Sequence, residues 1–140
     1  MRITFLLDRL EGTNMPSSAS EPWGWHVSVD FIGAPIELIT SVENFENFVT
    51  ALTERTGMQK FGPLEAYHFA EHNPEAAGFS FNQFQATSNI CGHLVDKNGG
   101  GFIDCFSCRH YDEQQVVDII VEFFKPTKIK SRLVERTYPE

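Results

Sequence analysis

The chain has 140 residues and a formal net charge of −8, and 41% of its residues are hydrophobic, with thirteen phenylalanines among them. This length suits one domain with one aromatic-rich core, and the acidic balance argues against nucleic acid as a partner. No apolar run is long enough for a membrane span. The apolar stretch within residues 1–8 is too short for a secretory signal, so we interpret it as an ordinary N-terminal strand.

The cysteine count and one loop-like segment bear on compartment and domain limits. Cys91, Cys105 and Cys108 are an odd number in a chain without an export signal, which favours free thiols in a reducing cytoplasm. Residues 12–22 have the composition of a loop. We therefore expect an N-terminal extension and loop over residues 1–24 and one main domain over residues 25–140.

The first elements of the main domain are a strand and a helix. Residues 26–31 alternate between apolar and polar side chains, which indicates a half-buried strand. Thr40 and Glu43 have the spacing of a capping box, so a helix is expected to begin there and to end at Gly57. Its apolar residues recur at helical spacing and are Phe45, Phe48, Val49 and Leu52.

Strands dominate the rest of the chain. Residues 64–69 and 79–86 read as strands, and residues 90–95 and 102–108 predict a hairpin around the segment 97–101. Asp112 is the expected N-cap of a second helix, which Pro126 ends, and residues 128–134 predict a last strand. The buried stripe of that helix is expected to be Val116, Val117, Ile120, Phe123 and Phe124.

This order of elements predicts the fold class. Short connections between consecutive strands imply an antiparallel sheet, and two helices with one apolar face each can cover one side of it. We expect an α+β fold, a two-layer sandwich of a mainly antiparallel sheet with two helices packed on one face.

Four residues with reactive side chains stand in a fixed spacing in the second half of the chain. They are Ser80, Ser88, His93 and Cys108, and the cysteine ends an Ile-Asp-x-Phe-x-Cys segment. This pattern resembles the short bacterial S-adenosylmethionine decarboxylases, in which a serine lies eight residues before the cofactor serine, a histidine five after it, and a cysteine fifteen after the histidine. The similarity covers about residues 25–135.

The resemblance implies a mechanism. Ser88 would attack the carbonyl of Thr87, and the chain would break there to leave a pyruvoyl group derived from Ser88. His93 is the implied base of this processing, and Ser80 the implied hydrogen-bond donor to the oxyanion. The pyruvoyl ketone would then form a Schiff base with the amine of S-adenosylmethionine, and Cys108 would reprotonate the product after carbon dioxide leaves.

The resemblance also implies partners and a pathway. The substrate would be S-adenosylmethionine, a small molecule, and the product would feed spermidine, and so polyamine, synthesis in the cytoplasm. Members of the family commonly form homodimers, so a homodimer is expected. Tyr67 and Phe69 lie on the strand where the family places its adenine-stacking residue; the alternative is that both are core aromatics.

The chain departs from the family pattern around the cofactor serine and after the histidine. Thr87 and Asn89 stand where the family usually has Glu and His, and Lys97 stands where it has a ribose-binding Glu. A lysine cannot accept hydrogen bonds from ribose hydroxyls, so Asp96 is the candidate for that contact.

These departures leave alternatives open. One is a pyruvoyl decarboxylase for a smaller amino acid such as ornithine or arginine, and another is an uncleaved, inactive paralogue that binds a ligand or regulates a partner. Taken one at a time, each of the four reactive residues would more often be structural. A metal site drawn from Cys91, His93, Cys105, Cys108 and His110 is not expected, because a strand would point Cys105 and Cys108 to opposite faces.

The geometry of the predicted hairpin tests the enzymatic hypothesis. If its two-residue turn is Gly100-Gly101, His93 lies directly opposite Cys108. If the turn is Asn98-Gly99, Cys108 lies four residues further along the partner strand. The enzymatic hypothesis requires the first register or a bulge with the same effect, and a structure with the side chains of His93 and Cys108 far apart or on opposite faces of the sheet would count heavily against it.

Overall fold

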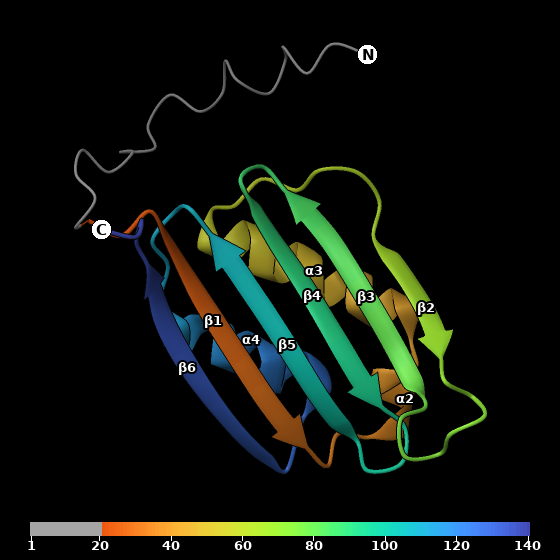
Figure 1. Cartoon of the computed structure of the whole chain (residues 1–140). Helices are drawn as coiled ribbons and strands as arrows, with labels where there is room; N and C mark the ends of the chain where they lie inside the picture. Colours follow the sequence, from red (N-terminus) through yellow and green to blue (C-terminus); the bar gives the residue numbers. More distant parts are fainter. Residues whose placement is uncertain (1–20) are drawn as a thin grey trace.

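The computed structural model describes residues 21–140, so the strand expected within residues 1–8 and most of the N-terminal extension lie outside the described residues. Six strands form one antiparallel sheet in the order β2-β3-β4-β5-β1-β6 (Figure 1). The strands are β1 (Gly24–Ile32), β2 (Glu65–Phe69), β3 (Gly78–Gln85), β4 (Ser88–Val95), β5 (Gly100–Ser107) and β6 (Lys128–Arg136). The helices are α2 (Ile36–Ile39), α3 (Val42–Thr56) and α4 (Glu113–Phe124).

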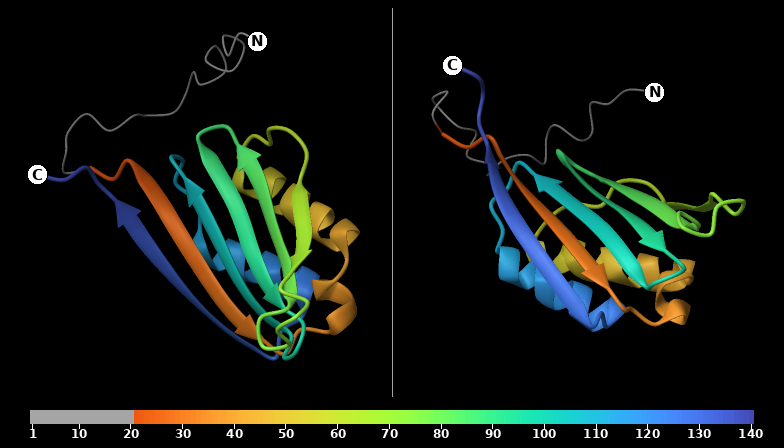
Figure 2. Two further views of the ribbon diagram at one scale, coloured as in Figure 1. Left: turned by 45° about the vertical axis from the view of Figure 1, so that its right-hand side comes forward. Right: turned by 60° about the horizontal axis from the view of Figure 1, so that its bottom comes forward.

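Both long helices lie on the same side of the sheet. Figure 2 shows α3 and α4 packed behind it, while the opposite side carries no element of the described chain. We call that opposite side the open face; its side chains include Tyr67, Ser80, His93 and Phe102, which lie in one row across β2, β3, β4 and β5. The predicted α+β two-layer sandwich is confirmed.

The helix limits follow from local hydrogen bonds, and one differs from the prediction. The N-cap of α3 is Ser41 and not Thr40, because Ser41 Oγ accepts the backbone N–H of Asn44 at 3.1 Å. The Thr40 hydroxyl instead donates to the carbonyl of Ile36 at 2.8 Å and closes α2, a one-turn helix that the sequence pattern did not predict. Gly57 ends α3 as predicted, with a φ of 72°.

The second long helix has the predicted start. The side chain of Asp112 accepts the backbone N–H of Gln114 at 3.0 Å, which satisfies one of the free donors at the start of α4. The helix ends at Lys125, whose φ is 48°, immediately before Pro126. Its buried stripe includes Ile119, which was not predicted, whereas Val117 and Phe123, which were, are only partly buried.

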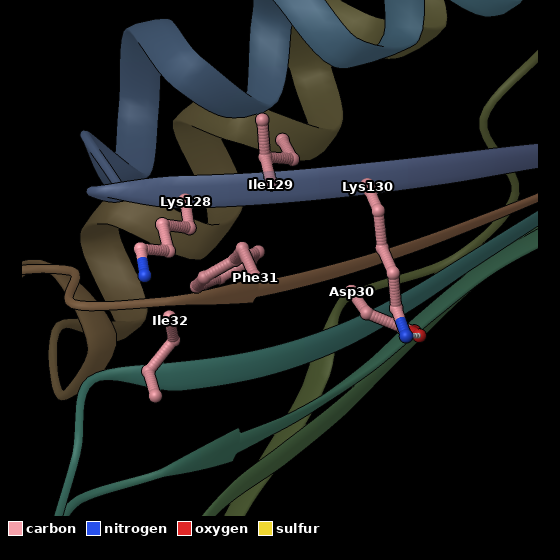
Figure 3. Close-up of a pocket in the computed structure, with 6 residues that line it drawn as sticks. All are labelled: Asp30, Phe31, Ile32, Lys128, Ile129 and Lys130. Atoms are coloured by element: carbon pink, nitrogen blue, oxygen red, sulfur yellow. Dashed lines mark ion pairs between the residues drawn. The ribbon is translucent and has the colours of Figure 1, made fainter.

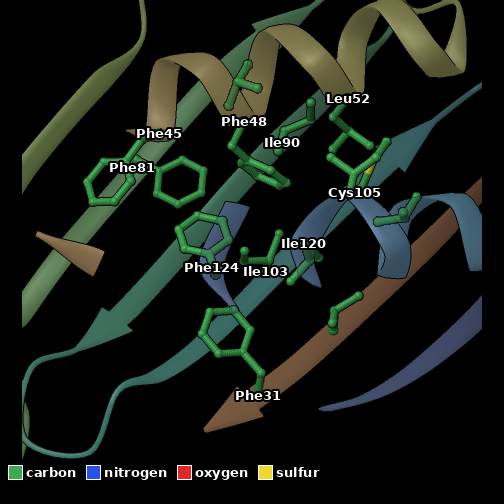
Figure 4. Packing of buried hydrophobic residues seen from close by; sticks show 14 of the residues in the cluster. Phe31, Phe45, Phe48, Leu52, Phe81, Ile90, Ile103, Cys105, Ile120 and Phe124 are labelled. Carbon is green, nitrogen blue, oxygen red and sulfur yellow. The ribbon is translucent and has the colours of Figure 1, made fainter. Parts of the chain in front are cut away.

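An aromatic cluster joins the two helices to the sheet (Figure 4). The ring of Phe45 stacks on Phe81 of β3 with centroids 5.3 Å apart, and Phe48 meets Phe124 of α4 edge-on at 5.1 Å. Phe45, Phe48 and Phe124 are completely buried. Burial of each such side chain stabilises the fold by about 1.5–3 kcal/mol, so this cluster fixes the layers against each other.

The register between β4 and β5 differs from both predicted alternatives. Val95 pairs with Gly100 and His93 with Phe102, so a four-residue loop connects the strands. This loop is tied to the segment after β1, because the N–H groups of Gly33 and Ala34 donate to the carbonyls of Asn98 and Gly99, both at 3.0 Å. These contacts come from a distant part of the chain and fix the longer loop.

The register has a direct consequence for the reactive residues. Ser88 pairs with Ser107, and the backbone N–H of Cys108 meets the carbonyl of Thr87. The expected position of Cys108 opposite His93 in the hairpin is therefore wrong, and Cys108 lies at the other end of β4.

Removal of one ring from the aromatic cluster should destabilise the protein strongly. We expect Phe48→Ala to lower the free energy of unfolding by about 3–5 kcal/mol, because it leaves a cavity between both helices and the sheet. Phe61→Ala is the matched control, since Phe61 is 48% exposed and its truncation should cost about 0.5 kcal/mol or less. Chemical denaturation measures both values. Equal losses for the two variants would contradict the assignment of Phe48 to the core.

Candidate functional site

The peptide bond between Thr87 and Ser88 leaves the tight turn that joins β3 to β4. Gln85 pairs with Ser88, so Ala86 and Thr87 form a two-residue turn. Thr87 has a φ of 58°, in the left-handed region that β-branched residues rarely occupy. Such a conformation costs about 1–3 kcal/mol. Strain is thus stored at the residue whose carbonyl belongs to the expected cleavage bond.

The thiol of Cys108 lies beside this strained residue. Cys108 Sγ and Thr87 Oγ1 are 2.7 Å apart, and the hydroxyl of Thr87 donates its own proton to the carbonyl of Ala86 at 2.6 Å. Because a threonine hydroxyl has one proton, the Cys108 S–H is the donor toward Thr87. The Cys108 sulfur is therefore held next to the Thr87-Ser88 bond.

The Ser88 hydroxyl points away from the open face. Ser88 Oγ donates to Ser107 Oγ at 2.8 Å, and Ser107 is a fully buried side chain of β5. The pattern of residues did not single out Ser107. Ser107 could have been identified only with the correct β4–β5 register, which places it directly opposite Ser88.

Ser80 and His93 form a second group, on the open face. They pair across β3 and β4, and Ser80 Oγ and His93 Nδ1 are 2.8 Å apart. His93 follows Ser88 by five residues on one strand, so their side chains point to opposite faces, about 16 Å apart along the strand. The structure brings Ser80 to His93 and Thr87 and Ser88 to Cys108, but it does not bring the two groups together within one chain.

Tyr67 and Phe69 belong with the second group. They lie on the edge strand β2, where Tyr67 pairs with Ser80, and their rings are 6.2 Å apart. Their side chains are 59% and 54% exposed, so the alternative that both are core aromatics is wrong. Phe102, which pairs with His93, is also exposed, and these aromatic rings surround the Ser80–His93 pair.

Asp96 lies in the loop between β4 and β5, where it binds His68. His68 Nε2 and Asp96 Oδ2 are 2.7 Å apart, and this hydrogen bond, followed by the attraction of the carboxylate, raises the pKa of His68. Asp96 Oδ1 is buried and makes no hydrogen bond with another described residue. Lys97 forms an ion pair with Glu75 beside it. One oxygen of Asp96 is therefore without a hydrogen-bond partner among the described residues, and the residue is one of those that line a hollow of about 590 Å³.

An aromatic hollow lies near Ser88 and was not predicted. Trp23 stacks on Phe106 with ring centroids 6.0 Å apart, and the guanidinium of Arg136 lies 5.9 Å from the Phe106 ring. Together with Thr137 and Tyr138 these side chains line about 310 Å³. Phe106 pairs with Asn89, the neighbour of Ser88. The hollow is built from the two ends of the described chain, and no local sequence pattern reports such a contact.

A further hollow lies at the opposite end of β1. Figure 3 shows its lining by β1 and β6, with an ion pair of 3.5 Å between Lys130 and Asp30. Its lining includes Ile32, the last residue of β1. The part of β1 that lies near Ser88 is the opposite end, because Trp25 pairs with Ser107, and Ser107 pairs with Ser88. This hollow is therefore separate from the Thr87-Ser88 turn.

The residues considered for a metal site do not converge. Cys105 is buried in the core, where the loss of solvent raises its thiol pKa to about 12, while His93 lies on the open face. Within residues 21–140 no three histidine, cysteine or acidic side chains are grouped closely enough to hold a metal ion. In the same residues no helix is both long and apolar enough to cross a membrane.

The fold and the site define an α+β sandwich in which a serine follows a strained hairpin turn beside a cysteine thiol. A family model for S-adenosylmethionine decarboxylase matches residues 25–137, and the chain belongs to this family. The fold is similar to that of the adenosylmethionine decarboxylase from Aquifex aeolicus, with a TM-score of 0.71 and 20% identity, over 86% of this chain and 96% of that one. No curated protein matches the chain significantly.

The His68–Asp96 pair should make stability depend on pH. Because the pKa of His68 is raised in the folded state, the pair stabilises the fold fully below the ordinary histidine pKa. That contribution is lost as the pH rises through the raised value. Asp96→Asn should therefore lower the melting temperature more at about pH 5.5 than at about pH 9. Asp118→Asn, in an exposed helical position, is the control, and an equal effect of Asp96→Asn at both pH values would contradict the pairing.

Proposed function

We propose that the chain is a self-processing, pyruvoyl-dependent decarboxylase that acts on S-adenosylmethionine in the cytoplasm and supplies spermidine synthesis. One observation carries this proposal: Thr87 has a left-handed backbone conformation. The peptide bond that follows it leads to Ser88, whose hydroxyl is held by a hydrogen bond, and the Cys108 thiol contacts Thr87 itself. Strain at the carbonyl of Thr87 lowers the barrier to attack by a neighbouring hydroxyl, which an amide in a relaxed chain resists.

The cleavage proceeds in balanced steps. Ser88 Oγ bonds to the carbonyl carbon of Thr87, the peptide C–N bond breaks, and the hydroxyl proton moves to the freed nitrogen of Ser88. Loss of the Ser88 α-proton to a base then expels the Thr87 carboxylate and leaves dehydroalanine, which water converts to a pyruvoyl group and ammonia. His93 is the proposed base, because an imidazole nitrogen can accept a proton, and Ser80 orients its ring through the 2.8 Å contact.

The residues around Ser88 fit a pyruvoyl group at this position. Such a group supplies an electron sink for the carbanion that remains when a carboxylate leaves as carbon dioxide. Cys108 holds its proton beside residue 87 and is the proposed donor to the α-carbon of the product. The net charge of −8 favours a substrate that carries a cationic centre.

The separation of the two groups supports a homodimer. Thr87 and His93 are both exposed, so each can be reached by a second copy of the chain even though they lie far apart within one copy. The open face exposes four aromatic rings, which a monomer rarely leaves uncovered; they are Tyr67, Phe69, Phe84 and Phe102. We propose that the partner chain covers this face and supplies its Ser80–His93 pair to the Thr87-Ser88 bond.

Specific residues favour two other functions. Asn89 and Thr87, which replace the family's usual neighbours of the serine, favour an uncleaved paralogue that binds a ligand or regulates a partner. Lys97, engaged by Glu75 and standing where the family has a ribose-binding Glu, favours a smaller amino acid as substrate. Release of carbon dioxide from S-adenosylmethionine, ornithine and arginine compares the substrates directly.

Mass spectrometry of the purified chain tests self-cleavage. We expect fragments 1–87 and 88–140, the second with a blocked N-terminus that reacts with carbonyl reagents. Ser88→Ala should remain whole, because it lacks the attacking hydroxyl, while Ser131→Ala should be cleaved as fast as the wild type. A wild-type chain that stays whole after long incubation would refute the enzymatic proposal and support the paralogue.

A mixing experiment tests the homodimer. His93→Ala keeps Ser88 but lacks the base, and Ser88→Ala keeps His93 but cannot be cleaved. Alone, each should stay whole; when the two are co-expressed, the His93→Ala chain should be cleaved, because its partner supplies His93. Cleavage of His93→Ala on its own, or no cleavage in the mixture while the wild type is cleaved, would show that the partner chain does not act in this way.

A further inference from the structure

We infer that Ser107 is the residue that positions the Ser88 hydroxyl for cleavage of the chain, an inference that rests on the proposed self-processing. Ser107 is completely buried, pairs with Ser88 across β4 and β5, and accepts a hydrogen bond from Ser88 Oγ at 2.8 Å. His93, in contrast, faces the other side of the sheet in the same chain. Within one chain, the side chain of Ser107 therefore contacts Ser88 Oγ, the oxygen that attacks in the proposed cleavage.

The hydroxyl of Ser107 is fixed by a second contact. The backbone N–H of Arg109 donates to Ser107 Oγ at 3.0 Å. A hydroxyl oxygen has two lone pairs, and the Arg109 N–H occupies one of them, since it can only donate. The second lone pair receives the proton of Ser88. Because a buried hydroxyl without its partners costs about 1–3 kcal/mol, this arrangement resists rotation of either side chain.

The direction of this hydrogen bond suits the first step of cleavage. With its O–H directed at Ser107, Ser88 Oγ keeps its lone pairs for the carbonyl carbon of Thr87, next to it in the chain. The Oγ–C bond forms, the C–N bond breaks, and the hydroxyl proton ends on the Ser88 nitrogen. A serine hydroxyl is far too weak a base to keep that proton. Ser107 is therefore a positioning residue, and it acts before the partner's His93 is needed for the later elimination.

The position of Ser107 follows from the same features that fix the hairpin. A shift of the register by one residue would turn Ser107 to the open face and leave Ser88 opposite an apolar or aromatic neighbour. Phe106 and Cys108 are the residues on either side of it, and neither offers an oxygen acceptor in its side chain. The hydroxyl at residue 107 is thus the group that the register places against Ser88.

The experiment follows cleavage of freshly purified full-length protein by intact mass over time. Ser107→Ala should slow the appearance of fragment 88–140 by about tenfold or more, the equivalent of one lost hydrogen bond to the reacting group. Ser107→Thr keeps the hydroxyl and should restore the rate to within about threefold of the wild type. Should Ser107→Ala fold poorly by its melting curve, Ser107→Cys replaces it, as a residue of similar size with a weak acceptor. Ser131→Ala, a hydroxyl bound to Glu113, is the control for loss of a serine hydrogen bond elsewhere.

Hydroxylamine identifies the step at which Ser107 acts, because at neutral pH it cleaves an ester between Ser88 and Thr87 but leaves the Thr87-Ser88 peptide bond intact. Cleavage at Asn98-Gly99, the kind of peptide bond that hydroxylamine can attack, would give fragment 1–98, whose mass differs from that of fragment 1–87. In Ser107→Ala hydroxylamine should release little extra fragment 1–87, since formation of the ester is the slowed step and the ester does not accumulate. Extra fragment would place Ser107 at a later step and overturn the inference, as would cleavage of Ser107→Ala at the wild-type rate or failure of Ser107→Thr to restore it. A wild-type chain that stays whole, with or without hydroxylamine, instead removes the proposed self-processing and this inference with it.

Discussion

The pairing of β4 with β5 is the constraint on which the rest of the site depends. The N–H groups of Gly33 and Ala34 anchor the loop between these strands and so select one register. In that register Ser107 faces Ser88 on the helix side, while His93 faces Phe102 on the open face. Because side chains alternate along a strand, a slip of β5 by one residue against β4 would turn Ser107 away from Ser88 and break the group around the Thr87-Ser88 bond. The Ser80–His93 pair depends instead on the register between β3 and β4.

The strain at Thr87 persists because the strands on either side of the turn cannot relax. The buried side chain of Gln85, the last residue of β3, donates to Thr53 Oγ1 of α3 at 2.9 Å. Four residues earlier, Phe81 packs against Phe45 and Phe48 of α3 in the aromatic cluster. The helix layer therefore holds β3, the pairing with β5 holds β4, and the turn between them takes up a conformation that an isolated peptide of this sequence would avoid.

The sequence is enough for the fold class and most of the elements, because apolar alternation and helical spacing are local signals. It does not define the hairpin register, since that register depends on a contact with residues 33 and 34, more than sixty positions away. The role of Ser107 and the Trp23–Phe106 stack could not be predicted from the sequence for the same reason, since both depend on contacts between distant parts of the chain. The family pattern identifies Ser80, Ser88, His93 and Cys108 as a set, but spacing along a chain does not tell which of them share one face.

That division changes what the set of four residues means. A base and a nucleophile placed at opposite ends and faces of one strand are no catalytic unit in a single chain, however well their spacing matches a family. They become one if a second copy of the same sheet brings its exposed histidine to the exposed turn, and the uncovered aromatic rings around His93 provide the apolar surface for that contact. In the proposed processing, two features act on Ser88 before a partner is needed, the strained Thr87 and the buried Ser107, and both are positioned within one chain. In this proposal, the geometry within one chain promotes the attack of the Ser88 hydroxyl on the carbonyl of Thr87. It does not provide for the later transfer of the Ser88 α-proton to His93.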